Sequence, residues 1–539
     1  MRSWLLLLNL VILLVLAGCK EDTQKSTQEK ENQTREIANL TQTAKIQNYF
    51  QEADSSEIYE SEELKEFYRE NGFRPVWNEK SLREDISRII TRIDSEGLYP
   101  KEYHAEKIQE LLSSVNQNSE EKNTRLEILL TDASLKLIRH LSSGKLKPAE
   151  IYEIWGTPVN EVSPKDSLHK MISENSLESS FRELSPKNQI YQGLKAALQA
   201  YNIEELKTES ATQIETGGLI RLGESSERLS QVGKRLTELG LYSGTIDTIY
   251  SKELENAVKA FQKEHGLQVD GLLGTSTIAN MNLTKKDRYQ QILINMERWR
   301  WYPRDLGEHY IIINIPDYHL SVVKEKDTIS SHKIMVGTRY RQTPVFSDKI
   351  EYVVYNPTWT IPPTIKTNDV IPGARKDLDY LSSRNIKIYD KEGDVVDPTE
   401  IDWSSYQARN YTYRQNPGGS NPLGRVKIIY PNQYMIYLHD TPSQALFEKN
   451  SRAQSSGCVR VQNALDLAKY LLNDQEKYTD SVIDEILASG KTREIPVKKQ
   501  VKVHHFYWTA SVENDSIRFI DDIYHLDKPL WDLFNPEND

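Results

Sequence analysis

Hydrophobic positions recur at helical spacing through the stretch between residues 61 and 201. One run of apolar residues at four-residue steps marks a single helix face: Leu129, Ala133, Leu137 and Leu141. Prolines separate this helix from its neighbours, and no residue here stands in a pattern that suggests catalysis. We therefore expect residues 58–210 to form a helical scaffold domain.

Two further apolar stripes at helical spacing follow, and a glycine ends each of them: Gly240 and Gly266. Their apolar members are Leu229, Val232, Leu236 and Leu239, and then Leu254, Ala257, Val258 and Phe261. A Val-Asp-Gly turn at 269–271 precedes a third, shorter stripe through Ile278 and Met281. The pattern predicts a compact unit of three helices within residues 217–285.

From residue 289 onward the pattern changes to short runs of β-branched and aromatic residues bounded by Pro, Gly or Asn. Three such runs are HYIIINI (309–315), KIEYVVYNP (349–357) and YMIYLHD (434–440). Such runs are typical of strands, so we expect residues 289–495 to form a mainly β domain. Within it, residues 366–420 are rich in loop-forming residues, and an insertion of this length predicts a lid over a site. Residues 496–539 are expected to pack on this domain.

The chain has 539 residues, of which 38% are hydrophobic and 27% charged, values that suit a soluble protein of several domains. The predicted fold class is therefore multidomain α+β. The 68 basic and 79 acidic residues give a net charge of −11, which disfavours a nucleic-acid partner. The two cysteines, Cys19 and Cys458, are too few for a disulfide-rich scaffold or a cysteine-rich zinc site.

The first cysteine follows an apolar run that is too short to span a bilayer. Trp4–Leu16 is almost wholly apolar and follows Arg2, which is the pattern of a secretory signal. The segment Leu-Ala-Gly-Cys resembles the lipobox of bacterial lipoproteins, which implies removal of residues 1–18 and lipid attachment at Cys19. An ordinary signal peptide with an incidental cysteine is the alternative. Residues 19–57 are polar, which predicts a flexible tether.

The second cysteine lies in the sequence SSGCVRV, and His439 precedes it at the end of a predicted strand. A cysteine nucleophile reacts as its thiolate, and a nearby histidine can accept the thiol proton. Gly457 lets the backbone pass close to a substrate, and the N–H groups of Gly457 and Cys458 can stabilise an oxyanion. The guanidinium of Arg460 suits a substrate carboxylate. From these residues alone, a buried structural cysteine and a structural histidine stay open as alternatives.

The string HDTPSQALFEKNSRAQSSGCVRV, residues 439–461, resembles the active-site motif of the YkuD-type L,D-transpeptidases. In that motif an upstream histidine precedes Ser/Thr-His-Gly-Cys-x-Arg/Asn at a restricted spacing, and the interval from His439 to Ser455 falls within that range. Four further segments match the family: NMERWRWYP (295–303), MVGTRYRQTPVFS (335–347), NPTWTIPPTI (356–365) and NPLGRVKI (421–428).

The three-helix region also resembles a known module, since residues 232–278 are similar to the peptidoglycan-binding domain of wall-active enzymes. A helical spacer without a ligand is the alternative. Together with the helical scaffold, these matches make almost the whole mature chain resemble the large, multidomain L,D-transpeptidases of Gram-negative envelopes.

The resemblance implies that Cys458 is the nucleophile and that His439 is the proton donor and acceptor, and we expect Gly457 to supply a backbone oxyanion donor. Five side chains are expected around the substrate, with ordinary packing as the alternative for the aromatic ones: Arg460, Ser456, Trp359, Tyr437 and Tyr413. Ser456 departs from the family pattern, which has a histidine immediately before the Gly-Cys pair. Because the upstream histidine is the usual base of the family, activity is still expected.

The expected function is that of a lipid-anchored L,D-transpeptidase of the periplasm that remodels peptidoglycan. Cys458 would attack the carbonyl between the L-centre of a diamino acid and the D-alanine at position four of a donor stem peptide. D-Alanine would leave, and an acceptor amine would resolve the thioester as a 3→3 crosslink. We expect a monomer without metal or organic cofactor, with peptidoglycan stem peptides and a membrane as partners. A thioester-forming hydrolase and a non-catalytic wall-binding anchor are the alternatives.

Overall fold

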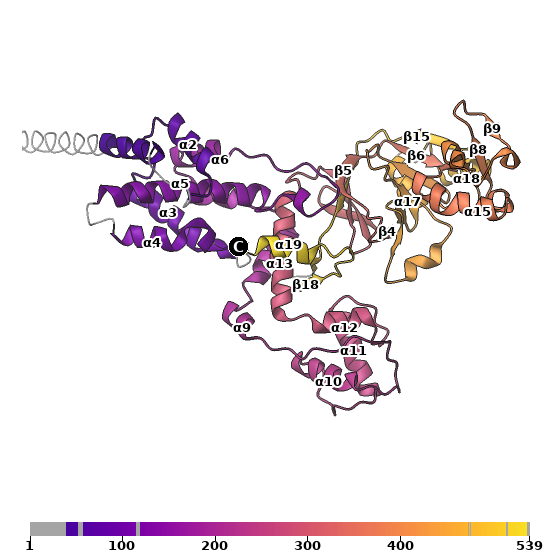
Figure 1. Ribbon diagram of the computed structural model, residues 1–539, viewed down its shortest axis with the longest axis horizontal. Coiled ribbons are helices and arrows are strands. Elements are labelled where there is room, and N and C mark those ends of the chain that lie inside the picture. Colours follow the sequence, from indigo (N-terminus) through magenta and orange to yellow (C-terminus); the bar gives the residue numbers. More distant parts are fainter. Residues whose placement is uncertain are drawn as a thin grey trace, which may run out of the picture. The chain divides into compact units, whose positions relative to one another are not determined.

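The computed structural model describes residues 39–51, 58–114, 119–472, 474, 476–513 and 516–535 (Figure 1). The expected signal peptide and Cys19 lie outside these residues. The chain divides into two compact units. The first holds the described residues up to Lys145 together with Glu161–Lys187, and the second holds Leu146–Asn160 and the chain from Asn188 onward. No helix in the described ranges is both long and apolar enough to cross a membrane.

The first unit is a helical bundle around one long helix, α5 (Glu120–Ser143). The helices that pack against α5 are α2 (Ser61–Glu70), α3 (Lys80–Thr91), α4 (Ala105–Ser114), α6 (Pro164–Ser173) and α7 (Leu177–Leu184). Two short 3-10 turns, Ile93–Glu96 and Pro100–Tyr103, connect α3 to α4. The apolar stripe expected on α5 is buried, and so are most residues of its central turns. The helical character expected here is confirmed. The expected bounds of 58–210 are not, because residues 146–160 and 188–210 belong to the second unit.

A buried carboxyl, Glu127 of α5, ties a loop to this bundle. Its carboxylate accepts the backbone N–H of Val76 at 2.6 Å and that of Trp77 at 3.2 Å, and the hydroxyl of Tyr68 at 3.0 Å. Burial raises the pKa of Glu127 to about 7. Because protein groups already occupy the carboxylate, its role is structural, as expected for a scaffold.

Residues 39–51 are helical, although their polar composition predicted a flexible tether. Ile46 is fully buried, and the ring of Phe50 lies 5.7 Å from that of Tyr68 and 6.3 Å from that of Phe73. The tether prediction is wrong for these residues. A few well-spaced apolar side chains can hold a helix on a bundle even when the average composition of the segment is polar.

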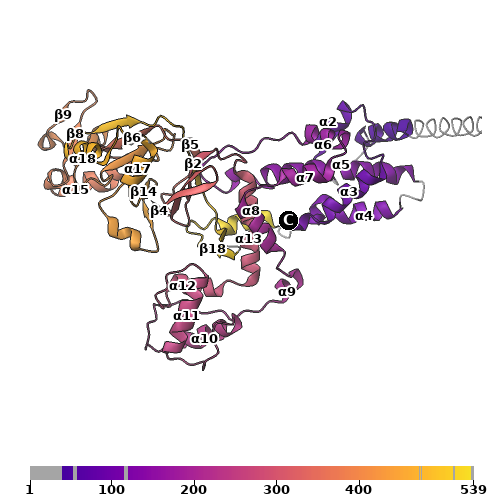
Figure 2. The ribbon, with the colours of Figure 1, turned by 180° about the vertical axis from the view of Figure 1, so that it is seen from behind.

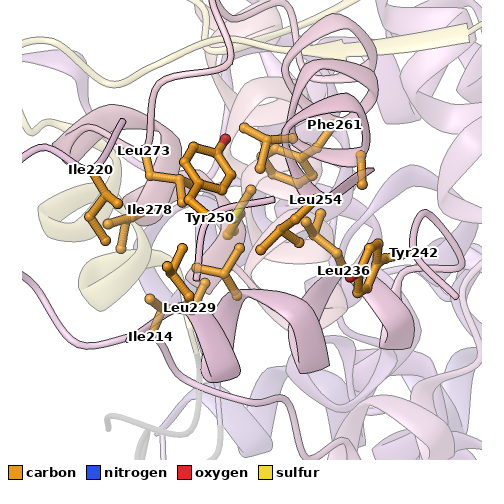
Figure 3. Packing of buried hydrophobic residues seen from close by; sticks show 14 residues of the cluster. Ile214, Ile220, Leu229, Leu236, Tyr242, Tyr250, Leu254, Phe261, Leu273 and Ile278 are labelled. Carbon is orange, nitrogen blue, oxygen red and sulfur yellow. The ribbon is translucent and has the colours of Figure 1, made fainter. Parts of the chain in front are cut away.

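Residues 217–285 contain the three expected helices, α10 (Arg228–Glu238), α11 (Lys252–Glu264) and α12 (Thr275–Asn282). Their apolar stripes meet in one core, into which Leu236 of α10 and Leu254 of α11 point (Figure 3). Gly240 and Gly266, which follow α10 and α11, have φ values of +75° and +65°. Both are in the left-handed region that favours glycine, as the sequence predicts.

One side chain of α11 fixes the turn that follows this helix. Gln262 is 1% exposed; its amide donates to Asp270 Oδ1 at 2.9 Å and to the Leu272 carbonyl at 3.1 Å. Its oxygen accepts the N–H of Gly271 at 2.8 Å. The side chain of Gln262 therefore holds the Val-Asp-Gly turn against helix α11.

Most of the second unit is built on a 12-stranded sheet of order β1-β5-β16-β2-β3-β4-β14-β12-β11-β6-β15, with β13 paired to β4 (Figure 2). Its strands are β1 (Trp155–Gly156), β2 (His309–Asn314), β3 (His319–Lys324), β4 (Asp327–Gly337), β5 (Val345–Lys349), β6 (Tyr352–Tyr355), β11 (Val426–Ile429), β12 (Leu438–His439), β13 (Ala453–Ser455), β14 (Val459–Val461), β15 (Arg493–Pro496) and β16 (Lys502–Phe506). Helix α17 (Ala464–Leu472) packs on β6 and β11, and α18 (Asp480–Ala488) follows it. The three expected strand runs supply β2, β6 and β12, which confirms the mainly β domain.

Helix α13 (Lys285–Trp301) leads from the three-helix region into this sheet. It begins at a capping box of Thr284 and Asp287. Just beyond its end, the ring of Tyr302 stacks on Phe506 of β16 with centroids 4.0 Å apart. The helices α8 (Gln189–Leu198) and α9 (Ile203–Thr208) also pack on α13.

The insertion between β6 and β11 is a small subdomain with its own sheet, of order β7-β10-β8-β9 (Figures 1 and 2). Its elements are β7 (Trp359–Thr360), α14 (Pro363–Ile365), α15 (Ile371–Lys376), α16 (Asp379–Ser382), β8 (Ile386–Tyr389), β9 (Val395–Val396) and β10 (Thr412–Gln415). Tyr413 lies in its apolar core, 1% exposed, and donates its hydroxyl to the Ala408 carbonyl at 3.0 Å. The expectation that Tyr413 walls the substrate groove is therefore wrong. Side chains alternate between the two faces of β10, and Tyr413 lies on the face that is buried in the core.

The C-terminal segment comprises β17 (Ala510–Glu513), β18 (Ser516–Phe519) and α19 (Asp527–Phe534). Asp527 pairs with the buried guanidinium of Arg298 in α13 at 2.7 Å. Gln291 of α13 donates to the carbonyls of Thr509 at 2.7 Å and Ile520 at 3.1 Å. The segment is thus held to the long helix by buried polar contacts as well as by packing.

Candidate active site

Strand pairing places the predicted nucleophile and base on one face of the sheet. In the parallel pair β12–β14, Leu438 is opposite Val459 and His439 is opposite Arg460. The same register sets Tyr437 beside Cys458, and the Val459 N–H donates to the Tyr437 carbonyl at 3.1 Å. Because side chains alternate along a strand, four of them share one face: Tyr437, His439, Cys458 and Arg460.

A fifth side chain joins this face from the neighbouring strand. Lys427 of β11 is the register partner of His439 in the antiparallel pair β11–β12. Its Nζ lies 3.8 Å from the centre of the Tyr437 ring, a cation–π contact. Three neighbouring strands therefore supply the thiol, the imidazole, the phenol and two cations to one patch of the sheet.

Short hydrogen bonds hold the cysteine loop in shape. Ser455 Oγ donates to the Cys458 carbonyl at 2.6 Å and accepts the Gly457 N–H at 3.1 Å. Gly457 has φ +115°, where other residues are strained. The N–H of Gly457 is thus already bonded within the loop, which argues against the oxyanion role expected for it and leaves that of Cys458 as the candidate donor.

The Cys458 thiol is half-buried and protonated at rest. Burial raises the pKa of Cys458, and this effect is opposed by hydrogen bonds from the N–H and hydroxyl of Tyr437 and by the charges of Lys427 and Arg460. The Sγ atom also lies 3.6 Å from the Met435 carbonyl, to which the thiol donates. The surroundings therefore stabilise a thiolate once it forms, although they do not keep one at neutral pH.

His439 is a buried, neutral imidazole. Burial lowers the pKa of His439 to about 3, and the nearby charges of Arg460 and Lys427 act in the same direction. Its Nδ1 lies 2.6 Å from the Asp440 carbonyl, which can only accept, so we assign the proton to Nδ1. The Pro422 carbonyl, a second acceptor, also bonds the ring. With the proton on Nδ1, Nε2 carries the lone pair that a general base requires.

Neither cation at the site has a carboxylate within ion-pair distance in the described part of the chain. The contact of the Arg460 guanidinium is with the Met335 sulfur at 4.0 Å, and its Nε is buried without a hydrogen-bond partner. Lys427 faces the Tyr437 ring. Both cations are half-buried, and a carboxylate acts on Lys427 only at longer range, from Glu494. Partly desolvated cations without a close ion-pair partner suit an anion that arrives with a ligand.

The remaining predicted side chains border this patch. Trp359, the first residue of β7 in the insertion, is half-buried and hydrogen-bonds to the side chain of Tyr437. Ser456 is exposed and accepts a hydrogen bond from Arg341 Nη1 at 3.0 Å. No group of three or more His, Cys, Asp or Glu side chains in the described ranges could hold a metal ion. The patch thus combines a thiol, an imidazole, a phenol and two cations, and Trp359 of the insertion borders it.

Comparison with known proteins finds matches for three parts of the chain. The matching families are the scaffold domain at residues 62–198, the "Putative peptidoglycan binding domain" at 225–281 and the L,D-transpeptidase catalytic domain at 308–499. A relative from Haemophilus influenzae, named "Putative L,D-transpeptidase", is 38% identical over 251 residues, which are 45% of this chain and 50% of that protein. Residues 308–499 thus match the family model of the L,D-transpeptidase catalytic domain, which is the YkuD family. The expected combination of scaffold, peptidoglycan-binding and L,D-transpeptidase domains is confirmed.

The chain thus spans about half the length of the curated relative that it matches. Among solved structures, the L,D-transpeptidase from Xylanimonas cellulosilytica is 14% identical, with 54% of this chain and 99% of that chain covered and a TM-score of 0.17. The L,D-transpeptidase from Mycobacterium smegmatis is 12% identical, with 36% and 58% covered and a TM-score of 0.18.

Within the L,D-transpeptidase domain, one residue of the patch escaped sequence reasoning. Lys427 lies in the segment NPLGRVKI, and its neighbours Val426 and Ile428 are buried on the opposite face of β11. A lysine between two core residues of a strand, in a segment that matches the family, is the signal that would have found it. The hydroxyl of Tyr437 was also missed, since it was expected to supply a wall and not a hydrogen bond to the sulfur.

Proposed function

We propose that this chain is an L,D-transpeptidase that forms 3→3 crosslinks in peptidoglycan through a thioester on Cys458. The observation that carries the proposal is the shared face of β11, β12 and β14. There a thiol, a neutral imidazole and two cations without carboxylate partners lie together in an L,D-transpeptidase domain. The residues of this patch suit each step of the reaction.

Donor binding would use the cations and the aromatic rings. A stem peptide carries free carboxylates, and the guanidinium of Arg460 can bind one of them through two parallel hydrogen bonds. Lys427 adds a second positive charge beside the thiol. The rings of Trp359 and Tyr437, whose side chains hydrogen-bond to each other, would border the bound peptide, with the insertion acting as the predicted lid.

Acylation would begin when Nε2 of His439 takes the thiol proton and Cys458 attacks the carbonyl that precedes D-alanine. The negative charge that develops on the carbonyl oxygen would be stabilised by the Cys458 N–H and the Tyr437 hydroxyl. The tetrahedral intermediate then collapses, its C–N bond breaks, and the imidazolium returns the proton to the D-alanine amine. The products are free D-alanine and a thioester.

Resolution would reverse these roles. An acceptor amine attacks the thioester, His439 takes a proton from the attacking nitrogen, the C–S bond breaks and the thiol is restored. The thioester conserves the energy of the broken amide, so the exchange requires no external energy source. Ser456 stands where the family has a second histidine, but the base proposed here is His439, so this departure leaves the chemistry intact.

The decisive experiment incubates the purified protein with disaccharide-tetrapeptides and determines the masses of the products. We expect crosslinked dimers that have lost one D-alanine. Trimmed monomers would instead identify a thioester-forming hydrolase, and unchanged substrate would identify a non-catalytic anchor.

A companion experiment tests the nucleophile. Incubation with a carbapenem should add one covalent label to the wild-type chain, located on the peptide that contains Cys458. Cys458→Ala should abolish the label, whereas the matched variant Ser456→Ala should retain it. Labelling that survives in Cys458→Ala would contradict the assignment of the nucleophile.

Residues 225–281 match a family of peptidoglycan-binding domains, which points to the cell wall or periplasm. We propose further that the chain is a periplasmic lipoprotein anchored through Cys19. Cys19→Ser should abolish the incorporation of labelled palmitate and release the protein from membranes.

We also propose that residues 217–285 bind peptidoglycan, which sedimentation with purified sacculi tests. The protein is proposed to be a monomer, and light scattering tests this oligomeric state.

A further inference from the structure

The carbonyl of Gly457 is held by a side chain from outside the cysteine loop. Thr343, between β4 and β5, is 2% exposed and donates its hydroxyl to the Gly457 oxygen at 2.7 Å. A peptide bond is planar and trans, so the Gly457 carbonyl and the Cys458 N–H point in opposite directions within one plane. The bond from Thr343 therefore also sets the direction of the Cys458 N–H.

Thr343 is held in turn by the C-terminal segment. The hydroxyl of Tyr524 accepts the Thr343 N–H at 3.1 Å and donates to the Gly337 carbonyl at 2.8 Å. The backbone between Gly337 and Thr343 turns back on itself, since the Gly337 N–H donates to Thr343 Oγ1 at 2.9 Å. A Cβ on Gly337 would lie 2.0 Å from the Arg341 carbonyl, so the turn is too tight for any side chain there. One phenol thus closes this turn at both ends.

Tyr524 is itself fixed within the buried interior. Its N–H donates to the hydroxyl of Tyr507 at 2.9 Å, and the two rings stack with centroids 5.5 Å apart. Tyr507 donates to Asp522 Oδ1 at 2.5 Å, and its backbone N–H and carbonyl both bond the hydroxyl of Tyr302 at the end of α13. Polar contacts therefore run without a break from α13 to the cysteine loop.

We propose that Tyr524 and Thr343 are positioning residues that aim the Cys458 N–H at the oxyanion of the reaction, a role that rests on the proposed function of Cys458. The Gly457 N–H is bonded to Ser455, so the loop has the Cys458 N–H to offer to the substrate. Tyr524 lies beyond residue 499, where the match to the catalytic-domain family ends. A segment outside the matched domain therefore completes the active site.

The test compares two reactions of the same thiol in the full-length protein. Acylation by a carbapenem or a tetrapeptide forms an oxyanion, whereas alkylation by iodoacetamide does not. For Tyr524→Phe and for Thr343→Val we expect acylation and kcat to fall about tenfold to a hundredfold, somewhat less than the loss of an oxyanion donor itself. KM and the rate of alkylation should stay within about twofold of wild type, because substrate binding and thiol exposure are unchanged.

Two controls keep the interpretation specific. Thr343→Ser retains the hydroxyl and should restore most of the acylation rate. Tyr470→Phe removes a hydroxyl that bonds His309 on β2, and should leave both reactions unchanged. If circular dichroism shows that Tyr524→Phe is unfolded, the Thr343→Val and Thr343→Ser pair decides the question.

The outcomes separate this role from the proposed function. A wild-type chain that is not acylated overturns the proposed function and this role with it. If the wild type is acylated and Tyr524→Phe and Thr343→Val react at the wild-type rate, only the positioning role is overturned. Equal slowing of acylation and alkylation also overturns it, because that result indicates general disorder of the loop.

Discussion

His439 and Arg460 are register partners in the parallel pair of β12 and β14, so the imidazole and the guanidinium stand side by side on one sheet face. Burial lowers the pKa of His439 first, and the neighbouring guanidinium lowers it further, to about 3. The thiol of Cys458, on the same face, has its pKa raised by burial. This arrangement differs from an imidazolium–thiolate pair, in which the positive imidazolium and the negative thiolate would stabilise each other.

The first prediction concerns the pH dependence of the thiol. Because iodoacetamide reacts with the thiolate, its rate at Cys458 should rise about tenfold per pH unit from pH 6 to 9, with no inflection near 6.5 where free histidine titrates. The kcat/KM for transfer should lack an acidic limb at pH 6–7, since His439 is already neutral there. Mass spectrometry of the alkylated peptide gives the first profile. A plateau of alkylation below pH 7 would reveal a resting ion pair and contradict this reading.

The second prediction concerns the carboxylate site. Arg460→Met keeps an unbranched apolar stem but removes the charge, so kcat/KM for tetrapeptide donors should fall about tenfold to a hundredfold, the loss of a charge-assisted hydrogen bond. Alkylation by the neutral reagent iodoacetamide should change far less. Arg339→Met, at an exposed arginine, is the matched control. The assignment fails if a donor whose carboxylates are amidated suffers the same loss as the natural donor.

The contrast between predicted and missed residues has a physical origin. Cys458 and His439 lie within one recognisable string, so the local sequence is enough to propose them. The helical stripes that begin at Leu229 and Leu254 repeat at fixed spacing and are found in the same way. Lys427 and Tyr524 act through partners on other strands and segments of the chain, and only strand register and tertiary packing bring these together. The alternation of Lys427 with buried residues could have indicated the face on which it lies. Its partners and those of Tyr524 depend on the tertiary packing.

The strands of the insertion were also missed by the sequence pattern. Its sequence reads as loops because its strands are very short, yet four of them pair into a sheet over a core of their own. Gly457 was expected to supply an oxyanion donor, but its N–H donates to Ser455 Oγ, a contact that depends on the rotamer of Ser455 and that no sequence pattern encodes.

The third prediction concerns stability and pH in the second unit. Burial lowers the pKa of His505 to about 3 and of His504 to about 4, as it does for His439. Below pH 6.5 these histidines bind protons in the unfolded chain but not in the folded chain, so the free energy of unfolding falls as the pH drops. Their full contribution to stability is present above pH 6.5. Each histidine contributes at most about 1.4 kcal/mol per pH unit. Asp527 has the opposite effect on stability and offsets about one of these histidines. Burial raises the pKa of Asp527 to about 6, so the folded chain binds this proton before the unfolded chain does as the pH falls.

Urea denaturation between pH 7.5 and 5, followed by tryptophan fluorescence, measures this slope. His505→Phe preserves the stacking on Phe346 and should flatten the slope by about one proton, whatever the variant costs at pH 7.5. His525→Gln, at an exposed histidine, should leave the slope at its wild-type value. An unchanged slope in His505→Phe would show that the folded protein protonates this residue and would refute the prediction.

The last prediction concerns the three-helix region of residues 217–285. Gln262→Ala removes an amide that satisfies the Gly271 N–H, Asp270 and the Leu272 carbonyl at once, and it leaves a buried N–H unpaired. We expect the region to lose about 2–4 kcal/mol, the cost of an orphaned buried group plus a small cavity. Hydrogen exchange of the α11 and α12 amides in the full chain should accelerate accordingly, while amides of β2 and β16 keep their protection. Lys263→Ala, on the neighbouring exposed position of α11, is the control that should leave exchange unchanged. Equal acceleration in the sheet would mean that this region and the catalytic sheet unfold as one cooperative unit, contrary to the prediction.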